Sequence, residues 1–228
     1  MKNVFYILIF FTFAGFSVAK AADNLNFRCQ PFVLKPKVTI KAVFEPLKYN
    51  YSKVSRTLER MQKEEMNGQL VEGYKVNGLT PYKLETNLMF TLGKKVFNDG
   101  VTCFFPTEVN LTLTFKDPVI YIARQIKEGT CAYQVTLRHE QTHEQINVEA
   151  FEHYLPLIKD QFIAAVKKYS LMSRPKDDIK TDIVKDSLTK KYLGAINPLL
   201  DELSEEINME QSKLDRIEQY DYEQSLCL

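Results

Sequence analysis

Residues 130–154 read TCAYQVTLRHEQTHEQINVEAFEHY. Neither Gly nor Pro interrupts this stretch, and Thr130 is a good N-cap for the apolar pattern that begins directly after it, so the stretch predicts a helix. His139 and His143 are four residues apart, which places them on the same side of a helix, about 6 Å apart. Both imidazoles can then reach one metal ion, with Glu140 beside them. This is the H-E-x-x-H pattern of zinc sites, in which the Glu acts on a water at the metal.

The predicted buried face of this helix carries both histidines. It continues from His143 through Ile146, Ala150, His153 and Leu157. The alternative to a zinc site is a pair of core histidines satisfied by hydrogen bonds, and Glu140 between them favours the zinc site. His153 would lie about 15 Å along the helix from His143, too far to share one ion. We interpret His153 as a core residue or as one that supports the ligands.

A third protein ligand is expected, because a catalytic zinc ion usually has three, together with a water molecule. In the longer motif H-E-x-x-H-x-x-G-x-x-H, a Gly turns the chain and the last His folds back to the metal. Ile146 and Glu149 occupy those two positions here, so Glu149 is expected to stay on the helix and point away. The other common source is a carboxylate on a second helix that packs across the first.

A second long helix is predicted from about residue 183 to 222. Its apolar residues repeat at near-heptad spacing, which indicates packing on another helix: Leu200, Leu203, Ile207, Leu214 and Ile217. The same face, when extended, reaches Glu210 and Asp221. A buried carboxylate needs a partner, which a metal ion or a metal-bound histidine would supply. The alternative is that both acids lie at the wet ends of the face.

The first half of the chain is predicted to be rich in strands. Alternating apolar residues within 27–44 and 108–115 indicate half-buried strands. Shorter β-like runs are expected at 101–105, at 119–123 and between the turn signals of 69–97, among them Gly93. One amphipathic helix is expected at 52–66, closed by Asn67-Gly68. The strand at 108–115 or the one at 119–123 could be an edge strand that binds an extended substrate, or both could be internal.

Together these patterns predict an α+β fold. A mainly antiparallel N-terminal sheet with one helix precedes the long H-E-x-x-H helix and a C-terminal helical hairpin. Pro156 either kinks the metal helix or divides it in two. Residues 22–228 are expected to form one domain, with a β-rich lobe at 22–125 and a helical lobe at 126–228.

The N-terminus predicts export. Lys2 precedes an apolar run, and Ala19-Lys20-Ala21 supplies an A-x-A cleavage site, so residues 1–21 are interpreted as a secretory signal peptide. The run is shorter than the roughly 20 residues that span a membrane. The expected location is periplasmic or secreted, with no membrane attachment after cleavage. The balance of 30 basic and 29 acidic residues, without an Arg-rich run, argues against a nucleic-acid partner.

The four cysteines are expected to form disulfides in an exported chain. Three pairings are possible for Cys29, Cys103, Cys131 and Cys227. We favour Cys103–Cys131, which would join the sheet to the metal helix, with Cys29–Cys227 joining the chain ends. The chain has no C-x-x-C spacing, so the cysteines are not expected to bind the zinc.

The chain resembles the bacterial family of secreted zinc-dependent proteases catalogued as domain of unknown function 922. Three features carry the resemblance: Pro118 and Cys131 ahead of the metal helix, Leu-Arg-His-Glu-Gln-Thr-His at 137–143, and Tyr220-Asp221, similar to the family's Tyr-Asp-x-x-Thr-x-His-Gly. The resemblance covers roughly residues 45–228 and implies a zincin-like fold. The family's Thr, His and Gly positions hold Gln224, Leu226 and Cys227 here. If the family His is a ligand, either Asp221, or otherwise Glu223, replaces it, or the site is a degenerate one with two histidine ligands.

The leading hypothesis is an exported zinc metallopeptidase that acts on a peptide or protein. One Zn²⁺ held by His139, His143 and Asp221 would lower the pKa of its water from about 16 to about 7, and Glu140 would act as general base. Four residues are candidates for oxyanion stabilisation or ligand support: Tyr220, Tyr222, Glu223 and His153. The rival hypothesis is a non-catalytic exported protein with a zincin-like fold, which either holds zinc without hydrolysing a substrate or binds an envelope protein through its long C-terminal helices.

Overall fold

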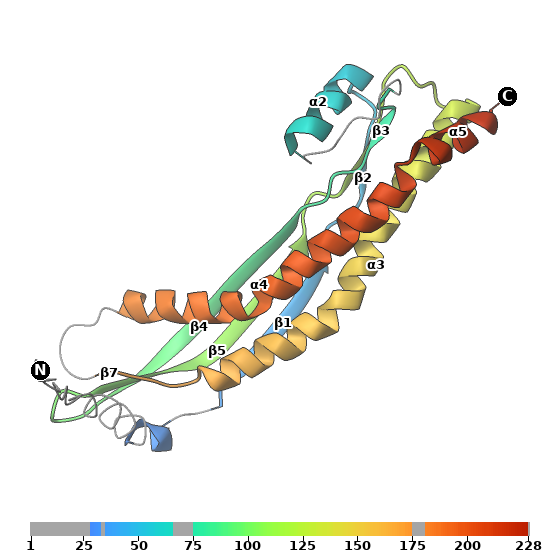
Figure 1. The fold of residues 1–228 in the computed structure, drawn as a ribbon. Helices are drawn as coiled ribbons and strands as arrows, with labels where there is room; N and C mark the ends of the chain where they lie inside the picture. Colours follow the sequence, from blue (N-terminus) through green and yellow to red (C-terminus); the bar gives the residue numbers. More distant parts are fainter. Residues whose placement is uncertain (1–27, 33–34, 66–74, 175–180, 228) are drawn as a thin grey trace, which may run out of the picture.

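The computed structural model describes residues 28–32, 35–65, 75–174 and 181–227. In this part of the chain two small sheets and four helices form an elongated α+β molecule, in which two long helices lie along the larger sheet (Figure 1). The signal peptide expected at 1–21 and the helix end expected at Asn67-Gly68 lie outside the described residues.

The strands form a four-stranded sheet A and a three-stranded sheet B. Sheet A has the order β1 (Lys37–Phe44), β5 (Thr102–Phe115), β4 (Leu84–Val96), and β7 (Met172–Arg174) pairs with the start of β5. Sheet B has the order β2 (Lys48–Asn50), β6 (Val119–Ile122), β3 (Gly78–Leu79). The β1–β5 and β2–β6 pairs are parallel, and the other pairs are antiparallel. The expected antiparallel sheet is therefore mixed, and both strands considered as substrate-binding edges, β5 and β6, are internal.

Three prolines divide these strands at one level. Pro46 lies between β1 and β2, Pro81 between β3 and β4, and Pro118 between β5 and β6. Phe115, just before the break, is paired on both sides, and Tyr121, just after it, is again paired on both sides. Because proline lacks the N–H that a strand ladder needs, no ladder crosses this level. The result is that the short sheet B lies apart from sheet A, over the start of the metal helix.

Sheet A is longer than the turn signals suggest. Gly93, expected in a turn, lies inside β4 opposite Phe105, whose ring fills the space that a Cβ at Gly93 would need. Pro106 is likewise inside β5, where the register of β4 shifts between Thr91 and Leu92. The register shift thus accommodates Pro106 inside the strand, and Gly93 lies in the regular pairing that follows the shift.

The metal helix is α3 (Cys131–Lys168), and Thr130 caps it as expected, by accepting a hydrogen bond from the backbone N–H of Tyr133. Pro156 does not divide it, and α4 (Thr181–Leu214) likewise runs through Pro198. Both helices bend along their length (Figure 1), as expected where a proline removes a helical hydrogen bond. The expected helix at 52–66 is α2 (Ser55–Glu65), with Leu58 buried against sheet B.

The two long helices cover one face of sheet A, and this contact forms the main core. Alternate residues of β5 are buried against both helices: Val109, Leu111, Leu113, Phe115 from the strand, Phe151, Ile158, Phe162 from α3, and Leu188, Tyr192, Ile196, Leu203 from α4. The buried face of α3 runs from His143 through Asn147 and Phe151, so the expected face through Ile146, His153 and Leu157 is displaced by about one residue. Leu157 is 46% exposed.

The last predicted helix is not continuous. It ends at Leu214, and after the two residues Asp215 and Arg216 a separate helix α5 (Ile217–Ser225) begins. The cap residue Arg216 is extended, with φ −86° and ψ 152°, so the chain changes direction there.

The favoured disulfide pairing is wrong, although all four cysteines are bonded. The pairs are Cys29–Cys103 and Cys131–Cys227. Cys103 is at the start of β5, whereas Cys131 follows the far end of that strand, and 14 extended residues cover about 45 Å. Figure 1 shows β5, with Cys103 near its start, and α3, which begins at Cys131, starting near opposite ends of the molecule. Cys103 and Cys131 are therefore too far apart to be joined.

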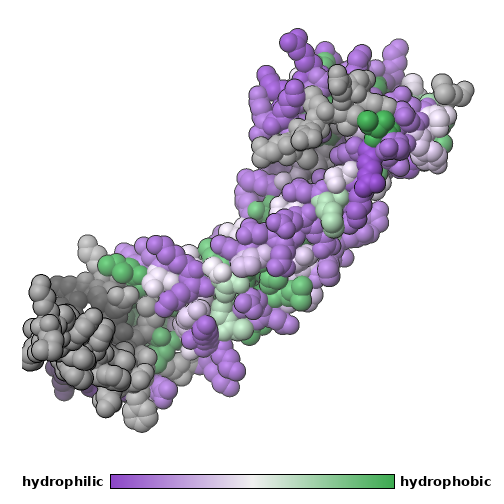
Figure 2. Space-filling view, viewed as in Figure 1, coloured by the Kyte–Doolittle hydropathy of each residue, from purple (hydrophilic) through white to green (hydrophobic). Residues whose placement is uncertain are grey.

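The surface in Figure 2 is mainly hydrophilic, with hydrophobic residues in small groups. Within the described ranges no helix has the length and apolar character needed to cross a membrane.

Replacement of Leu111 by Ala tests the main core. Leu111 is fully buried between the sheet and the helices, so the cavity should lower the free energy of unfolding by about 2–5 kcal/mol. Thr112→Ala, on the opposite face of β5, is the matched control and should cost less than about 1 kcal/mol. Urea denaturation measures both, and equal losses would contradict the assignment of the buried face.

Candidate metal centre

Three potential ligands from two elements meet at one point. His139 and His143 project from α3, and Asp215 comes from the link between α4 and α5. The two Nε2 atoms are 3.1 Å apart, and each is 3.2 Å from Oδ1 of Asp215. Among the residues that the structure describes, this is the one His/Cys/Asp/Glu group found to be close enough to hold a metal ion.

The triangle has the size of a zinc site. Ligand atoms about 2.0–2.2 Å from a tetrahedral ion lie about 3.3 Å from one another, close to the three observed separations of 3.1–3.2 Å. Both histidines are buried, and Asp215 is partly exposed. Two imidazoles and one carboxylate are a donor set that zinc accepts, with a fourth position left for water or substrate. The residues present therefore fit a zinc ion, although they do not by themselves exclude other divalent metals.

Helix α5 supplies the groups that orient two of these ligands. Nδ1 of His139 is 3.1 Å from Oε2 of Glu223, so the carboxylate fixes the ring with Nε2 turned inward. Gln219 donates a hydrogen bond to the same carboxylate at 2.8 Å. The hydroxyl of Tyr220 donates to Oδ1 of Asp215 at 2.6 Å. Ligand orientation therefore depends on α5 as well as on α3.

The site favours positive charge. Burial alone would lower the pKa of His139, but the carboxylates of Asp215, Glu140 and Glu223 outweigh burial and raise that pKa to about 9. Burial likewise opposes ionisation of Asp215, yet hydrogen bonds with the two histidines hold its pKa below the ordinary value. A proton on His139 thus balances the negative charge of the neighbouring carboxylates, and a divalent cation bound at the same place can do so as well.

Glu140 is held against strand β3. Its side chain is only 4% exposed, and Thr80 donates a hydrogen bond to its Oε2 at 2.7 Å. A Cβ at Gly78 would overlap the carboxylate, so a residue without a side chain is required there. Burial raises the pKa of Glu140, while the neighbouring histidines and Thr80 oppose the shift. A carboxylate with a raised pKa beside a metal position is suited to accept and return a proton.

A pocket of about 420 Å³ gives access to these groups. One wall is the segment 75–80, which includes the edge strand β3. The opposite walls come from α3 and from the α4–α5 region, and they include both histidines, Glu140, Asp215, Tyr220 and Glu223. A molecule in this pocket would contact the metal position and Glu140 at the same time.

The structure does not bring the expected third ligand to the histidines. Asp221 is exposed on α5 and lies outside the metal-binding group, whereas Asp215, six residues earlier, is inside it. The difference follows from the break at 215–216, which a continuous 3.6-residue pattern cannot anticipate. One signal was available, since Asp215 and Glu218 have the D-x-x-E spacing typical of a helix start.

Some of the other candidate residues lie beside the ligands, and the rest lie on the surface. Glu223 and Tyr220 lie beside the ligands, whereas Tyr222 is 59% exposed. The expected core or supporting role of His153 is wrong, because its side chain is 64% exposed and pairs with Glu206. Glu210 pairs with Lys213 on the surface of α4. Glu149 is exposed and bonded to Gln145, which agrees with its expected direction away from the metal.

No protein-family model, curated protein or solved structure matches this chain. The resemblance to the family of secreted zinc-dependent proteases stays a prediction, and the functional argument rests on the geometry of the site.

Metal analysis of three variants tests the ligand set. The purified wild type should hold about one zinc per chain by elemental mass spectrometry. His143→Ala and Asp215→Ala should each lower zinc affinity by at least about a hundredfold, because each removes a ligand. Asp221→Asn is the control and should keep wild-type zinc content. Loss of zinc in Asp221→Asn but not in Asp215→Ala would contradict the structure.

Proposed function

We propose that the protein is an exported zinc-dependent metallopeptidase. The observation that carries the proposal is that a buried carboxylate, Glu140, shares one pocket with the His139–His143–Asp215 triangle. A bound zinc ion supplies Lewis acidity there, which lowers the pKa of a water molecule from about 16 to about 7 and polarises a carbonyl. The two disulfides support the export part, since such bonds persist in oxidising compartments.

Glu140 is the proposed general base and acid. It accepts a proton from the water that attacks the scissile carbonyl carbon, and it returns this proton to the leaving amine nitrogen as the C–N bond breaks. Thr80 and Gly78 keep the carboxylate in one place, the first by a hydrogen bond and the second by leaving room. One proton of the water thus passes through Glu140 to the amine and the other stays on the new carboxyl group, while one C–O bond forms and the C–N bond breaks.

Strand β3 supports a peptide as the substrate. It is an edge strand of sheet B, and the segment 75–80 around it lines the pocket. An extended peptide can add to such an edge through main-chain hydrogen bonds, independently of its sequence. The proposed substrate-binding strand is therefore β3, which has only two residues, and not β5 or β6, which were considered from the sequence.

Replacement of Glu140 by Gln tests the catalytic step. The amide cannot accept the proton, so hydrolysis of a quenched fluorescent peptide library should fall by about a hundredfold or more. Zinc content should stay at the wild-type level, because Glu140 is not among the three ligand atoms of the triangle. Full activity in Glu140→Gln would refute the mechanism. Zinc binding by a wild type that hydrolyses no peptide would favour the rival, a non-catalytic zinc-binding protein.

Thr80 offers a second test of how Glu140 is held. Thr80→Val removes the hydrogen bond to a buried carboxylate at nearly constant volume, and kcat should fall roughly tenfold to a hundredfold. Thr80→Ser keeps the hydroxyl and should restore most of the rate. Zinc affinity should be the same in both variants. A rate that follows side-chain size rather than the hydroxyl would show that Thr80 acts by packing alone.

A further inference from the structure

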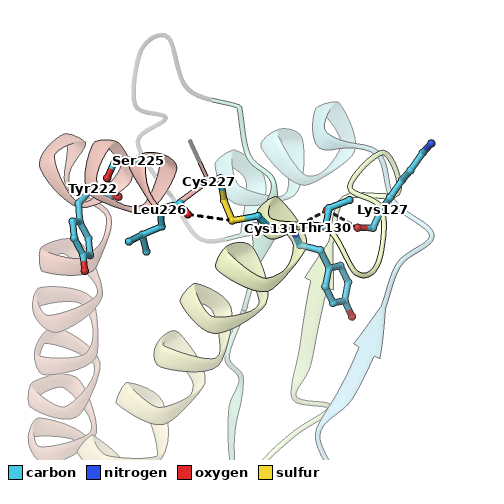
Figure 3. The surroundings of a disulfide bond; sticks show 8 residues. Lys127, Thr130, Cys131, Tyr222, Ser225, Leu226 and Cys227 are labelled. Atoms are coloured by element: carbon cyan, nitrogen blue, oxygen red, sulfur yellow. Dashed lines mark hydrogen bonds between the residues drawn. A yellow bond between two sulfur atoms is a disulfide. The ribbon is translucent and has the colours of Figure 1, made fainter.

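The two disulfides differ in exposure and in location. Cys29 and Cys103 are both fully buried, at the end of sheet A where β5 begins. Cys131 and Cys227 are both exposed, and Cys227 lines the pocket of the metal centre. Figure 3 shows their bond joining the first turn of α3 to the chain just after α5. An exposed disulfide is accessible to thiolates that cannot reach a buried one.

Helix α5, which this bond ties to α3, is short and buries little apolar surface. The helix has nine residues, a length that is marginal for an isolated helix in water. Its one buried residue is Glu223, while Ile217 and Tyr222 are at least half exposed. Apolar burial therefore contributes little to the docking of α5. The contacts that join it to the metal centre are the polar ones of Glu223 and Tyr220 and the Tyr220 ring against His139, and the Cys131–Cys227 bond ties its end to α3.

Those contacts link the disulfide to metal binding. Glu223 orients His139, Tyr220 holds Asp215, and Asp215 itself lies in the two-residue link that leads into α5. If α5 moves, one ligand loses its fixed position and another loses the partner that fixes its tautomer. The Cys29–Cys103 bond has no such link to the metal centre, because neither of its cysteines lines the pocket.

We infer that the Cys131–Cys227 disulfide is a redox-sensitive tether of the metal centre, whose reduction weakens metal binding. The inference rests on the metal centre of the proposed function but not on peptide hydrolysis. A dithiol reductant transfers two electrons and two protons to the bond. Its first thiolate forms a mixed disulfide with one cysteine, and its second thiolate displaces that cysteine. The products are two cysteine thiols and the oxidised dithiol.

Two double variants of the full chain separate this tether from general stabilisation. Zn²⁺ affinity is measured by competition with a chromogenic chelator. Cys131→Ser with Cys227→Ser should bind zinc about tenfold to a hundredfold more weakly than wild type, the range expected when support of ligands is lost. Cys29→Ser with Cys103→Ser is the matched control and should stay within about threefold. Serines also avoid new thiolate ligands for the ion.

A reduction experiment applies the same test to the unaltered chain. After brief treatment with dithiothreitol and its removal by gel filtration, alkylation should label Cys131 and Cys227 first, and reoxidation should restore zinc affinity. Equal affinity in the Cys131/Cys227 variant and wild type, or an equal loss in both double variants, would overturn the inference. A wild type that binds no zinc would overturn the metal centre as well. Zinc binding that depends on the redox state, in a protein that hydrolyses no peptide, would support the inference about the tether and refute only the proposed peptidase activity.

Discussion

The convergence of two histidines and three carboxylates, four of these five groups buried, in one pocket is the constraint on which the rest of this structure depends. His139, His143, Glu140 and Glu223 are buried, and Asp215 completes the group. Such groups are costly to remove from water unless each has a partner. The carboxylates around His139 raise its pKa to about 9 despite burial, and the same negative charge favours a bound dication. Every neighbouring element either contributes one of these groups or supports one.

The fold meets this constraint by ending regular structure near the site. Three prolines at one level stop the ladders of sheet A, and beyond them sheet B places Gly78 and Thr80 against Glu140. On the opposite side, the helix ends at Leu214 so that Asp215 can reach both histidines. The long helices and the 14-residue strand provide a rigid core. The short and irregular segments at its end then provide the chemistry, as is common for functional sites.

The parts of this arrangement that sequence could predict are the local ones. The capped helix and the facing of His139 and His143 follow from 3.6-residue geometry within one element. The buried face beyond His143 was misplaced because its next member, Asn147, is polar and satisfied by Gln211 across the helix pair. Asp215 was missed because its position depends on a two-residue break, and the disulfide pairing because it depends on the path of the whole chain. Long-range geometry of this kind leaves little trace in periodicity.

The order of the cysteines has a consequence for biosynthesis. The first pairs with the second and the third with the fourth, so the closed loops, 29–103 and 131–227, follow one another and are not nested. A chain that enters an oxidising compartment from its N-terminus presents the cysteines in this order, and domains form in the same direction. If the second cysteine is oxidised with the first, and the fourth with the third, the native bonds form directly. Either alternative pairing would require a third cysteine to arrive before the first bond could form.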